Sequence, residues 1–337
     1  MITETNEIPM VKGTDTQHWQ QTKRNAMIIF MAIVTAMCVG LTAHAQNPDE
    51  WKKMKGDVNL FLANDLGRNG YYEQKTIAAL MGEMGEAIGP EAVVAIGDVH
   101  HFEGVQSVDD PLWMTNYELI YSHPELMIPW YPVLGNHEYR GNTQAVIDYS
   151  DKSRRWMMTD RYYSKVFADN GTTLRIIFID TTPLIDRYHN NDTYQDVNAQ
   201  EVDKQIDWID RTLGEATEDW VVVVGHHPMY AQTTKDECER LDMQCRLLPV
   251  LQKHKDKVAM YVAGHIHNFQ HFRRGNDGID YVINSSASLT RKVTPIEGTQ
   301  FCSPAEGFSV LSVSKKQLCL YMIDKTGTAI HTIKKKG

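Results

Sequence analysis

Histidines and acidic side chains recur in this chain directly after short apolar runs. In Val258–Asn268, the run Val-Ala-Met-Tyr-Val-Ala leads into Gly-His-Ile-His-Asn. His265 and His267 are two residues apart, so in an extended backbone both imidazoles point to the same side. A single buried histidine is usually a hydrogen-bonded core residue, but two at this spacing are typical ligands for a transition metal. The spacing therefore predicts a metal-ligand pair at the end of a buried strand.

Four further strand-like runs stop at a polar residue. These residues are Asp65, Asp98, Asn136 and His226. Each alone is typical of a turn or a helix cap, but ligands in open α/β sheets gather at the carboxyl ends of strands, so one pocket can receive them all. Carboxylate and amide oxygens mixed with three imidazoles suit two transition-metal ions bridged by an aspartate. Such a metal pair clamps a phosphoryl group and activates water for in-line attack.

The elements between these residues predict an α/β fold, because apolar runs alternate with helical patterns. Helical periodicity covers Tyr72–Ile88, Asp110–Tyr121, Ala145–Trp156, Gln200–Leu213 and Leu247–His254. Tyr162–Asp180 indicates two strands around a turn at Asp169-Asn170-Gly171, and Leu184–Asn198 indicates a surface loop. The tail over residues 279–333 contains only strand-like runs. We therefore expect this tail to form a second sheet packed on the first.

The first 45 residues predict export. A long apolar segment, residues 27–43, follows Lys23-Arg24 and ends at Ala43-His44-Ala45, the layout of a secretory signal peptide cleaved near Ala45. The alternative is an uncleaved membrane anchor, although this segment is barely long enough to span a bilayer. We expect residues 1–45 to be an N-terminal extension and signal peptide and residues 46–337 to be a single domain. The mature protein would be secreted or periplasmic.

Composition limits the partners. The chain has 337 residues, 42% hydrophobic content and a formal net charge of −9, which is typical of a folded globule and argues against a nucleic-acid partner. After export, Cys238, Cys245, Cys302 and Cys319 would lie in an oxidising compartment, where three pairings are open. Cys238 and Cys245 can pair only if a helix begins after Cys238, since continuous helix holds them beyond disulfide reach.

The ordered motifs resemble those of the calcineurin-like metallophosphoesterases. They are Asp-x-Gly at 65, Gly-Asp at 97, Gly-Asn-His-Glu at 135, Gly-His at 225 and Gly-His-x-His at 264. Within that superfamily the chain is most similar to the small purple acid phosphatases of the tartrate-resistant type. This similarity covers nearly all of the mature chain and includes Gly97–Val105, Tyr149-Ser150, Arg155-Trp156, Tyr162-Tyr163 and Glu306-Gly307-Phe308. It implies a four-layer αββα sandwich of two mixed sheets flanked by helices.

The resemblance also implies roles for the site residues. Asp98 would bridge two metals, with Asp65 and His267 on the first and Asn136, His226 and His265 on the second. His137 would contact the phosphate and act as the general acid, with Glu138 as its orienting carboxylate. Substrate contacts are expected from Asn136, His137 and His227, although His227 has simple packing as an alternative. Leu184–Asn198 matches a loop that overhangs the site in these enzymes, but no cysteine is available in it for the disulfide found in mammalian members.

One position departs from the family pattern. Purple acid phosphatases have a tyrosine three residues after the bridging aspartate, and its phenolate on Fe(III) gives the colour; this chain has His101 there. It also has Gly67 where other metallophosphoesterases have a histidine ligand. We infer that His101 supplies that nitrogen to a first site of Asp65, Asp98, His101 and His267. The alternatives are an outward-facing His101 or its replacement by His100. The inference predicts a colourless enzyme with divalent metals.

Together these features predict an exported, acid phosphatase-like metallophosphoesterase that hydrolyses phosphate monoesters by in-line attack of a metal-bound hydroxide. Its cofactors would be two divalent or mixed-valence transition-metal ions, Fe, Zn or Mn. Its substrate would be a phosphorylated small molecule or phosphoprotein, and a membrane would be a partner only if the signal segment stays uncleaved. The alternatives are a phosphodiesterase or nucleotidase of the same superfamily and a non-catalytic binding module on the same fold.

Overall fold

The protein is described here by a computed structural model that covers residues 48–337, apart from the side chain of residue 195. The predicted signal segment and its cleavage site near Ala45 lie outside the described residues. The described residues belong to one compact unit. Within residues 48–337, no helix is both long and apolar enough to cross a membrane.

The first sheet has six strands in the order β13-β12-β11-β1-β2-β3. Its strands are β1 (Val58–Ala63), β2 (Ala92–Ala95), β3 (Trp130–Pro132), β11 (Gly307–Ser314), β12 (Gln317–Asp324) and β13 (Ala329–Lys336). The strands β1, β2 and β3 are parallel, and β11 joins β1 in antiparallel register. Every residue of β1 and β2 is buried, as expected for parallel strands covered on both faces.

The second sheet has seven strands in the order β10-β8-β9-β7-β6-β5-β4. They are β4 (Tyr163–Asp169), β5 (Thr172–Phe178), β6 (Trp220–Val224), β7 (Val258–Ala263), β8 (Phe269–Phe272), β9 (Asp280–Ile283) and β10 (Thr299–Ser303). The central strands β5, β6, β7 and β9 are parallel, while β4, β8 and β10 are antiparallel to their neighbours. Both sheets are therefore mixed, and each has a parallel part whose carboxyl ends can carry a site.

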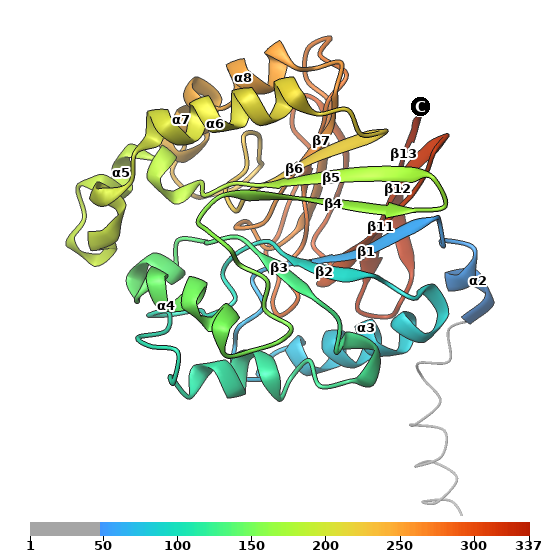
Figure 1. The fold of residues 1–337 in the computed structure, drawn as a ribbon, viewed down its shortest axis with the longest axis horizontal. Coiled ribbons are helices and arrows are strands. Elements are labelled where there is room, and N and C mark those ends of the chain that lie inside the picture. The colour runs from blue at the N-terminus through green and yellow to red at the C-terminus, as the bar shows by residue number, and fades with distance from the viewer. Residues whose placement is uncertain (1–47) are drawn as a thin grey trace, which may run out of the picture. The chain divides into compact units, whose positions relative to one another are not determined.

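Helices cover the outer faces of the strands, with α6, α7 and α8 on one side and α3 on the other (Figure 1). The α-helices are α2 (Pro48–Lys52), α3 (Gln74–Ile88), α4 (Thr143–Asp148), α5 (Asp186–His189), α6 (Val202–Glu215), α7 (Cys238–Arg246) and α8 (Leu248–Lys253). In α3 the predicted apolar face, including Ile77, Met81 and Met84, is buried. The expected architecture of two mixed sheets with flanking helices is confirmed.

Three expectations about local structure are wrong. The strand-only tail does not form a sheet of its own: β9 and β10 lie in the seven-stranded sheet, whereas β11, β12 and β13 extend the six-stranded sheet, where β11 pairs with β1. The helix expected over Asp110–Tyr121 shrinks to a π-helical turn at Met114–Glu118, where Gln74 Nε2 donates to the Asn116 carbonyl at 2.9 Å. The helix expected over Ala145–Trp156 ends earlier, with α4 closing at Asp148 before a 3₁₀ turn.

The expected surface loop Leu184–Asn198 also differs from the structure. It contains 3₁₀ turns at Thr182–Leu184 and Asp192–Ala199 on either side of α5. Its buried residues include Tyr188, Tyr194 and Val197. Their side chains pack the short helical turns against the rest of the protein, although their spacing in the sequence shows no helical period. We refer to Thr182–Ala199 as the 182–199 segment.

The four described cysteines are free, and α7 begins at Cys238, which places Cys238 and Cys245 on one helix.

Candidate metal centre

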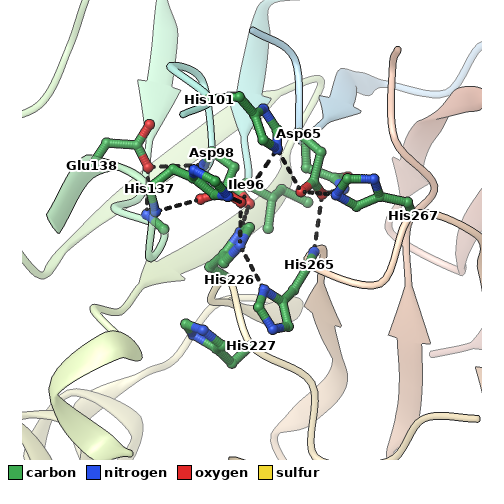
Figure 2. A network of polar contacts seen from close by, with 12 residues as sticks. Asp65, Ile96, Asp98, His101, His137, Glu138, His226, His227, His265 and His267 are labelled. Carbon is green, nitrogen blue, oxygen red and sulfur yellow. Dashed lines mark hydrogen bonds and ion pairs between the residues drawn. The ribbon is translucent and has the colours of Figure 1, made fainter. Parts of the chain in front are cut away.

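Most of the predicted ligands lie together where strands of both sheets end, namely Asp65, Asp98, His101, His226, His265 and His267 (Figure 2). Asp65, Asp98 and Asn136 follow β1, β2 and β3, whereas His226 follows β6 and the pair His265 and His267 follows β7. Four of these residues have positive φ, namely Asp65, Asp98, His265 and His267 at 52°, 52°, 70° and 64°. Non-glycine residues rarely adopt this conformation, and such backbone strain clusters at functional sites.

Asp98 lies at the centre of the group. Its Oδ2 is 3.2 Å from His226 Nε2 and 3.5 Å from His101 Nε2, so one oxygen faces ligands on two sides. Its Oδ1 accepts a hydrogen bond from the His137 main-chain N–H at 3.0 Å. Gly135 is required beside it, because a Cβ at that position would overlap the Asp98 carboxylate. The Asp98 carboxylate is therefore placed as a bridge between two clusters.

We call the predicted ligands Asn136, His226 and His265, together with Asp98 Oδ2, the second-metal cluster. His226 Nε2 is 3.3 Å from His265 Nδ1 and 3.2 Å from Asp98 Oδ2. Ligands of a tetrahedral metal with bonds of about 2.0–2.1 Å lie roughly 3.3 Å apart, so these separations fit one ion. Asn136 Oδ1 is buried and has no hydrogen-bond partner in the described part of the chain, as expected for an oxygen that binds a metal.

The first-metal cluster consists of Asp65, His101 and His267 with Asp98 Oδ2. Asp65 Oδ1 lies 2.8 Å from His267 Nε2 and 3.6 Å from His101 Nε2. His101 is only 2% exposed, and neither of its ring nitrogens has a hydrogen-bond partner within residues 48–337. His100 turns away and packs edge-on against Trp113 at a ring separation of 4.3 Å. The structure therefore places His101, and not His100, beside the two aspartates.

The charges of the buried groups suit metal binding. Burial alone would raise the pKa of Asp65 and of Asp98, but the neighbouring imidazoles hold both pKa values well below the usual range. Burial lowers the pKa of His101 to about 4, so its ring is neutral at physiological pH. Burial opposes protonation of His226, yet Asp98 raises its pKa to about 9, so this ring would have to release a proton to become a metal ligand. Ionised carboxylates and neutral imidazoles are the ligand forms that bind metals.

His137 lies at the open side of the site. Its side chain is 19% exposed, and its Nε2 is 3.9 Å from Asp98 Oδ2. Its Nδ1 is 2.9 Å from the Phe102 carbonyl oxygen, so an Nδ1–H donates there and Nε2 faces the reacting groups. Burial lowers the pKa of His137, although Asp98 opposes that shift.

Glu138 has a different contact set from the one expected. Its carboxylate accepts hydrogen bonds from the main-chain N–H groups of Asp98, His100 and Gly135 at 2.9, 3.0 and 2.8 Å. Burial raises its pKa to about 7. Among the described contacts, the His137 ring is oriented by the Phe102 carbonyl and not by Glu138. Glu138 instead ties together two of the loops that carry the ligands.

His227 is fully buried, and both of its ring nitrogens are occupied. Nδ1 is 2.8 Å from Thr181 Oγ1, and Nε2 is 3.1 Å from Tyr188 Oη. No ring nitrogen is left for a substrate in this arrangement. The geometry therefore favours the packing role for His227 over the expected substrate contact.

Two residues that contact His265 were not predicted from the sequence. Lys235 Nζ lies 2.9 Å from His265 Nε2, and Glu239 Oε2 lies 3.0 Å from the same nitrogen. Both come from the polar stretch before and inside the first turn of α7, whose charges look like an ordinary solvated face. No sequence signal separates Glu239 from the neighbouring acidic residues Asp236 and Glu237.

Comparison with known proteins places this geometry in a family. Residues 58–269 match the family model described as calcineurin-like phosphoesterase, and the chain belongs to that family. Purple acid phosphatase 3 of Arabidopsis thaliana is 30% identical over 298 residues, which cover 84% of this chain and 79% of that protein. Tartrate-resistant acid phosphatase type 5 of Homo sapiens is 28% identical over 262 residues, covering 73% of this chain and 79% of that protein.

Solved structures support the same fold. GAP50, the anchor in the inner membrane complex of Plasmodium, aligns with a TM-score of 0.70 at 21% identity, covering 83% of this chain and 88% of that chain. A dimetal phosphatase from Danio rerio aligns with a TM-score of 0.53 at 13% identity, covering 83% and 99%. At these identities the likeness concerns the fold alone.

Proposed function

We propose that this chain is a dinuclear-metal phosphatase that hydrolyses phosphate monoesters. The observation that carries the proposal is the position of Asp98 Oδ2, which lies 3.2 Å from His226 Nε2 and 3.5 Å from His101 Nε2. One carboxylate oxygen shared by two groups of imidazoles suits a bridged pair of metals better than two separate ions. The similarity to purple acid phosphatases supports the same reading.

The chain would hold one metal through Asp65, Asp98, His101 and His267, and the other through Asp98, Asn136, His226 and His265. Imidazole, carboxylate and amide donors suit Zn, Mn or Fe. When bound, such a pair supplies Lewis-acid activation of water and neutralises charge on the phosphoryl oxygens. In the first-metal cluster His101 replaces the phenolate of coloured relatives, so we expect divalent metals and no strong visible band.

The residues around the metals would orient the ester and move one proton. His137 is hydrogen-bonded at Nδ1 to Phe102 and directs Nε2 to the open side, where it can donate a proton to the leaving oxygen. Glu138 holds the main chain of Asp98 and Gly135, which fixes the His137 loop relative to the bridge. Export to the periplasm or cell exterior belongs to the same proposal and rests on residues 27–45.

The test compares p-nitrophenyl phosphate with its bis ester after loading the protein with Zn, Mn or Fe(II). We expect two metals per chain and much faster turnover of the monoester. Faster turnover of the bis ester would indicate a phosphodiesterase. No turnover with two metals bound would contradict the enzymatic function, and failure to bind two metals would contradict the metal centre itself.

A further inference from the structure

The outer nitrogen of His265 is bonded to a buried acid. Glu239 is 4% exposed and lies in the first turn of α7, and its Oε2 is 3.0 Å from His265 Nε2. On the opposite side of the ring, Nδ1 is 3.3 Å from His226 Nε2. A carboxylate at Nε2 holds the proton there and leaves the lone pair of Nδ1 directed toward the second-metal cluster.

Lys235 does not replace Glu239 in this role. Its Nζ is 3.1 Å from Nδ1 and 2.9 Å from Nε2 of His265. An ammonium almost equidistant from both ring nitrogens does not select one of them. It therefore acts on His265 as a neighbouring charge, and Glu239 remains the group that decides which nitrogen carries the proton.

The other oxygen of Glu239 faces the 182–199 segment. Oε1 accepts hydrogen bonds from Arg187 Nη1 at 3.0 Å and from Tyr188 Oη at 3.1 Å, and both residues belong to α5. The segment is also fastened farther along, where Arg161 Nη2 donates to Asp196 Oδ2 at 2.6 Å. One carboxylate thus connects a fixed segment on one side with a ligand histidine on the other.

This arrangement is particular to His265 among the ligand histidines. The outer nitrogen of His226 bonds to a main-chain carbonyl, Ile96 O, at 2.8 Å. The Nδ1 atoms of His101 and His267 have no hydrogen-bond partner among the described residues. A carboxylate partner raises the basicity of a metal-binding imidazole and fixes the plane of its ring, which a carbonyl does more weakly.

We propose that Glu239 is a positioning residue for the second metal, and that Arg187 and Tyr188 hold it in place. The 182–199 segment then sets the affinity of the second-metal cluster through a continuous chain of hydrogen bonds. This inference rests on the proposed dinuclear centre. Partners of this kind contribute about 10- to 100-fold to metal affinity, so Glu239→Ala should weaken the second metal by about that factor while the first stays bound.

The experiment uses the full chain loaded with Co²⁺ and titrated with a chelator. Bound metal is counted by mass spectrometry, and the visible d–d absorption of Co²⁺ reports the geometry of each site. Wild type should release two ions in separate steps. Glu239→Ala should release one ion at about 10- to 100-fold lower chelator concentration, with an altered d–d spectrum. Glu239→Gln keeps an oxygen acceptor and should restore part of the affinity.

Glu237→Ala is the matched control. It removes the same charge two residues earlier, at an exposed position that reaches no ligand in the described contacts. Its release profile should match wild type. If Glu239→Ala also matches wild type, or if it releases both metals equally, the proposal is overturned. If Glu239→Ala does not fold, Glu239→Gln and Tyr188→Phe together test the proposal. The proposal is overturned if both variants bind the second metal with wild-type affinity and show the wild-type d–d spectrum, because the chain of hydrogen bonds would then have no role.

The link to the 182–199 segment has its own test. Tyr188→Phe removes one donor to Glu239 and should lower second-metal affinity by a smaller factor. If the segment acts through Glu239, this effect disappears when Tyr188→Phe is combined with Glu239→Ala. Additive effects of the two substitutions would refute the link. A wild-type chain that binds fewer than two ions would instead refute the proposed metal centre, so the two failures are distinguishable.

Discussion

The two halves of the proposed metal centre are supported in different ways. In the second-metal cluster, the outer nitrogens of His226 and His265 are each hydrogen-bonded, one to Ile96 O and the other to Glu239. In the first-metal cluster, the outer nitrogens of His101 and His267 have no partner among the described residues. Its fixed element is Asp65, whose Oδ2 accepts from Asn64 Nδ2 at 2.6 Å and from the His265 main-chain N–H at 3.0 Å.

This difference indicates that the second half is preorganised by side-chain partners, whereas the orientation of the first half depends on packing of its rings. His101 contacts His137 and His267 at ring separations of 4.6 and 5.6 Å. Rings held by packing can adjust their plane to the bound ion more readily than rings held by hydrogen bonds. We therefore expect the first half to tolerate a change of ligand type better than the second.

Asp180 provides a third case at the end of β5. It is buried like Asp65 and Asp98, but its neighbours are Tyr139 and Arg161 in place of imidazoles. Burial raises the pKa of Asp180 to about 7, although Tyr139 and Arg161 oppose the shift. A buried acid at a strand end is thus not by itself a metal ligand. The partners around it decide whether it stays ionised.

The largest effect is expected where the two halves meet. Asp98→Asn replaces a charged bridging oxygen with a neutral amide, so both clusters should lose most of their metal. Losing several kcal/mol of charge stabilisation corresponds to about 10³-fold in rate or more. The measurement is turnover of p-nitrophenyl phosphate together with the metal content of the purified variant. Near-normal turnover at full metal content would remove Asp98 from the bridging position.

His137→Ala should affect neither half of the centre. Both metals should remain, but kcat should fall by about 10²-fold for alkyl phosphates, whose leaving groups need a proton in the transition state. The loss should be smaller for p-nitrophenyl phosphate, which has a good leaving group. Equal losses for both substrates would show that His137 is not the general acid.

Substitutions at His101 test the first half alone. His101→Ala should weaken the first metal by at least about 10-fold and leave the second in place. His101→Tyr offers a phenolate to the same ion, so the iron-loaded variant should gain an intense visible band that iron-loaded wild type lacks. A strong band in wild type would show that a tyrosine already reaches the iron. Unchanged metal affinity in His101→Ala would exclude His101 as a ligand.

Asp180→Asn should have the smallest effect, and on stability only. Because the native pKa of Asp180 is about 7 and its ordinary value is 3.8, the folded protein binds more protons than the unfolded chain between these values. Wild-type stability should therefore fall as pH rises through this window, and the variant should lose that slope. About 1 kcal/mol moves Tm by about 2 °C in larger domains, which melting curves from pH 4 to 8 can resolve.

Activity and metal content serve as the control for this variant. Both should be unchanged, since no described contact joins Asp180 to a ligand. A variant that keeps the wild-type slope of Tm against pH would show that Asp180 is ionised throughout. Lost metal would place Asp180 inside the centre and would remove the contrast with Asp65 and Asp98.

The sequence by itself determined the class of fold and indicated most of the residues that gather at the candidate site. The apolar run before Gly264 and the pair His265 and His267 are encoded within a dozen adjacent residues. A pattern that short indicates the strand and the residues that follow it, but not where their rings point, because His265 and His267 leave the extended conformation at φ values of 70° and 64°. The order of five such motifs was enough to indicate the family, and the family model and the two mixed sheets confirm it.

Only the tertiary structure decided which side chains at those strand ends face inward and what stands behind them. His100 and His101 are adjacent, yet His100 packs against Trp113 whereas His101 faces the two aspartates. The strands of the tail are divided between the two sheets by long-range pairing, such as that of β11 with β1, which lies more than two hundred residues away in the chain. The hydrogen bonds of Glu239 with His265 and Arg187 likewise join segments that are distant in the sequence. Such contacts depend on free energies shared between distant segments, which no local pattern of residues encodes.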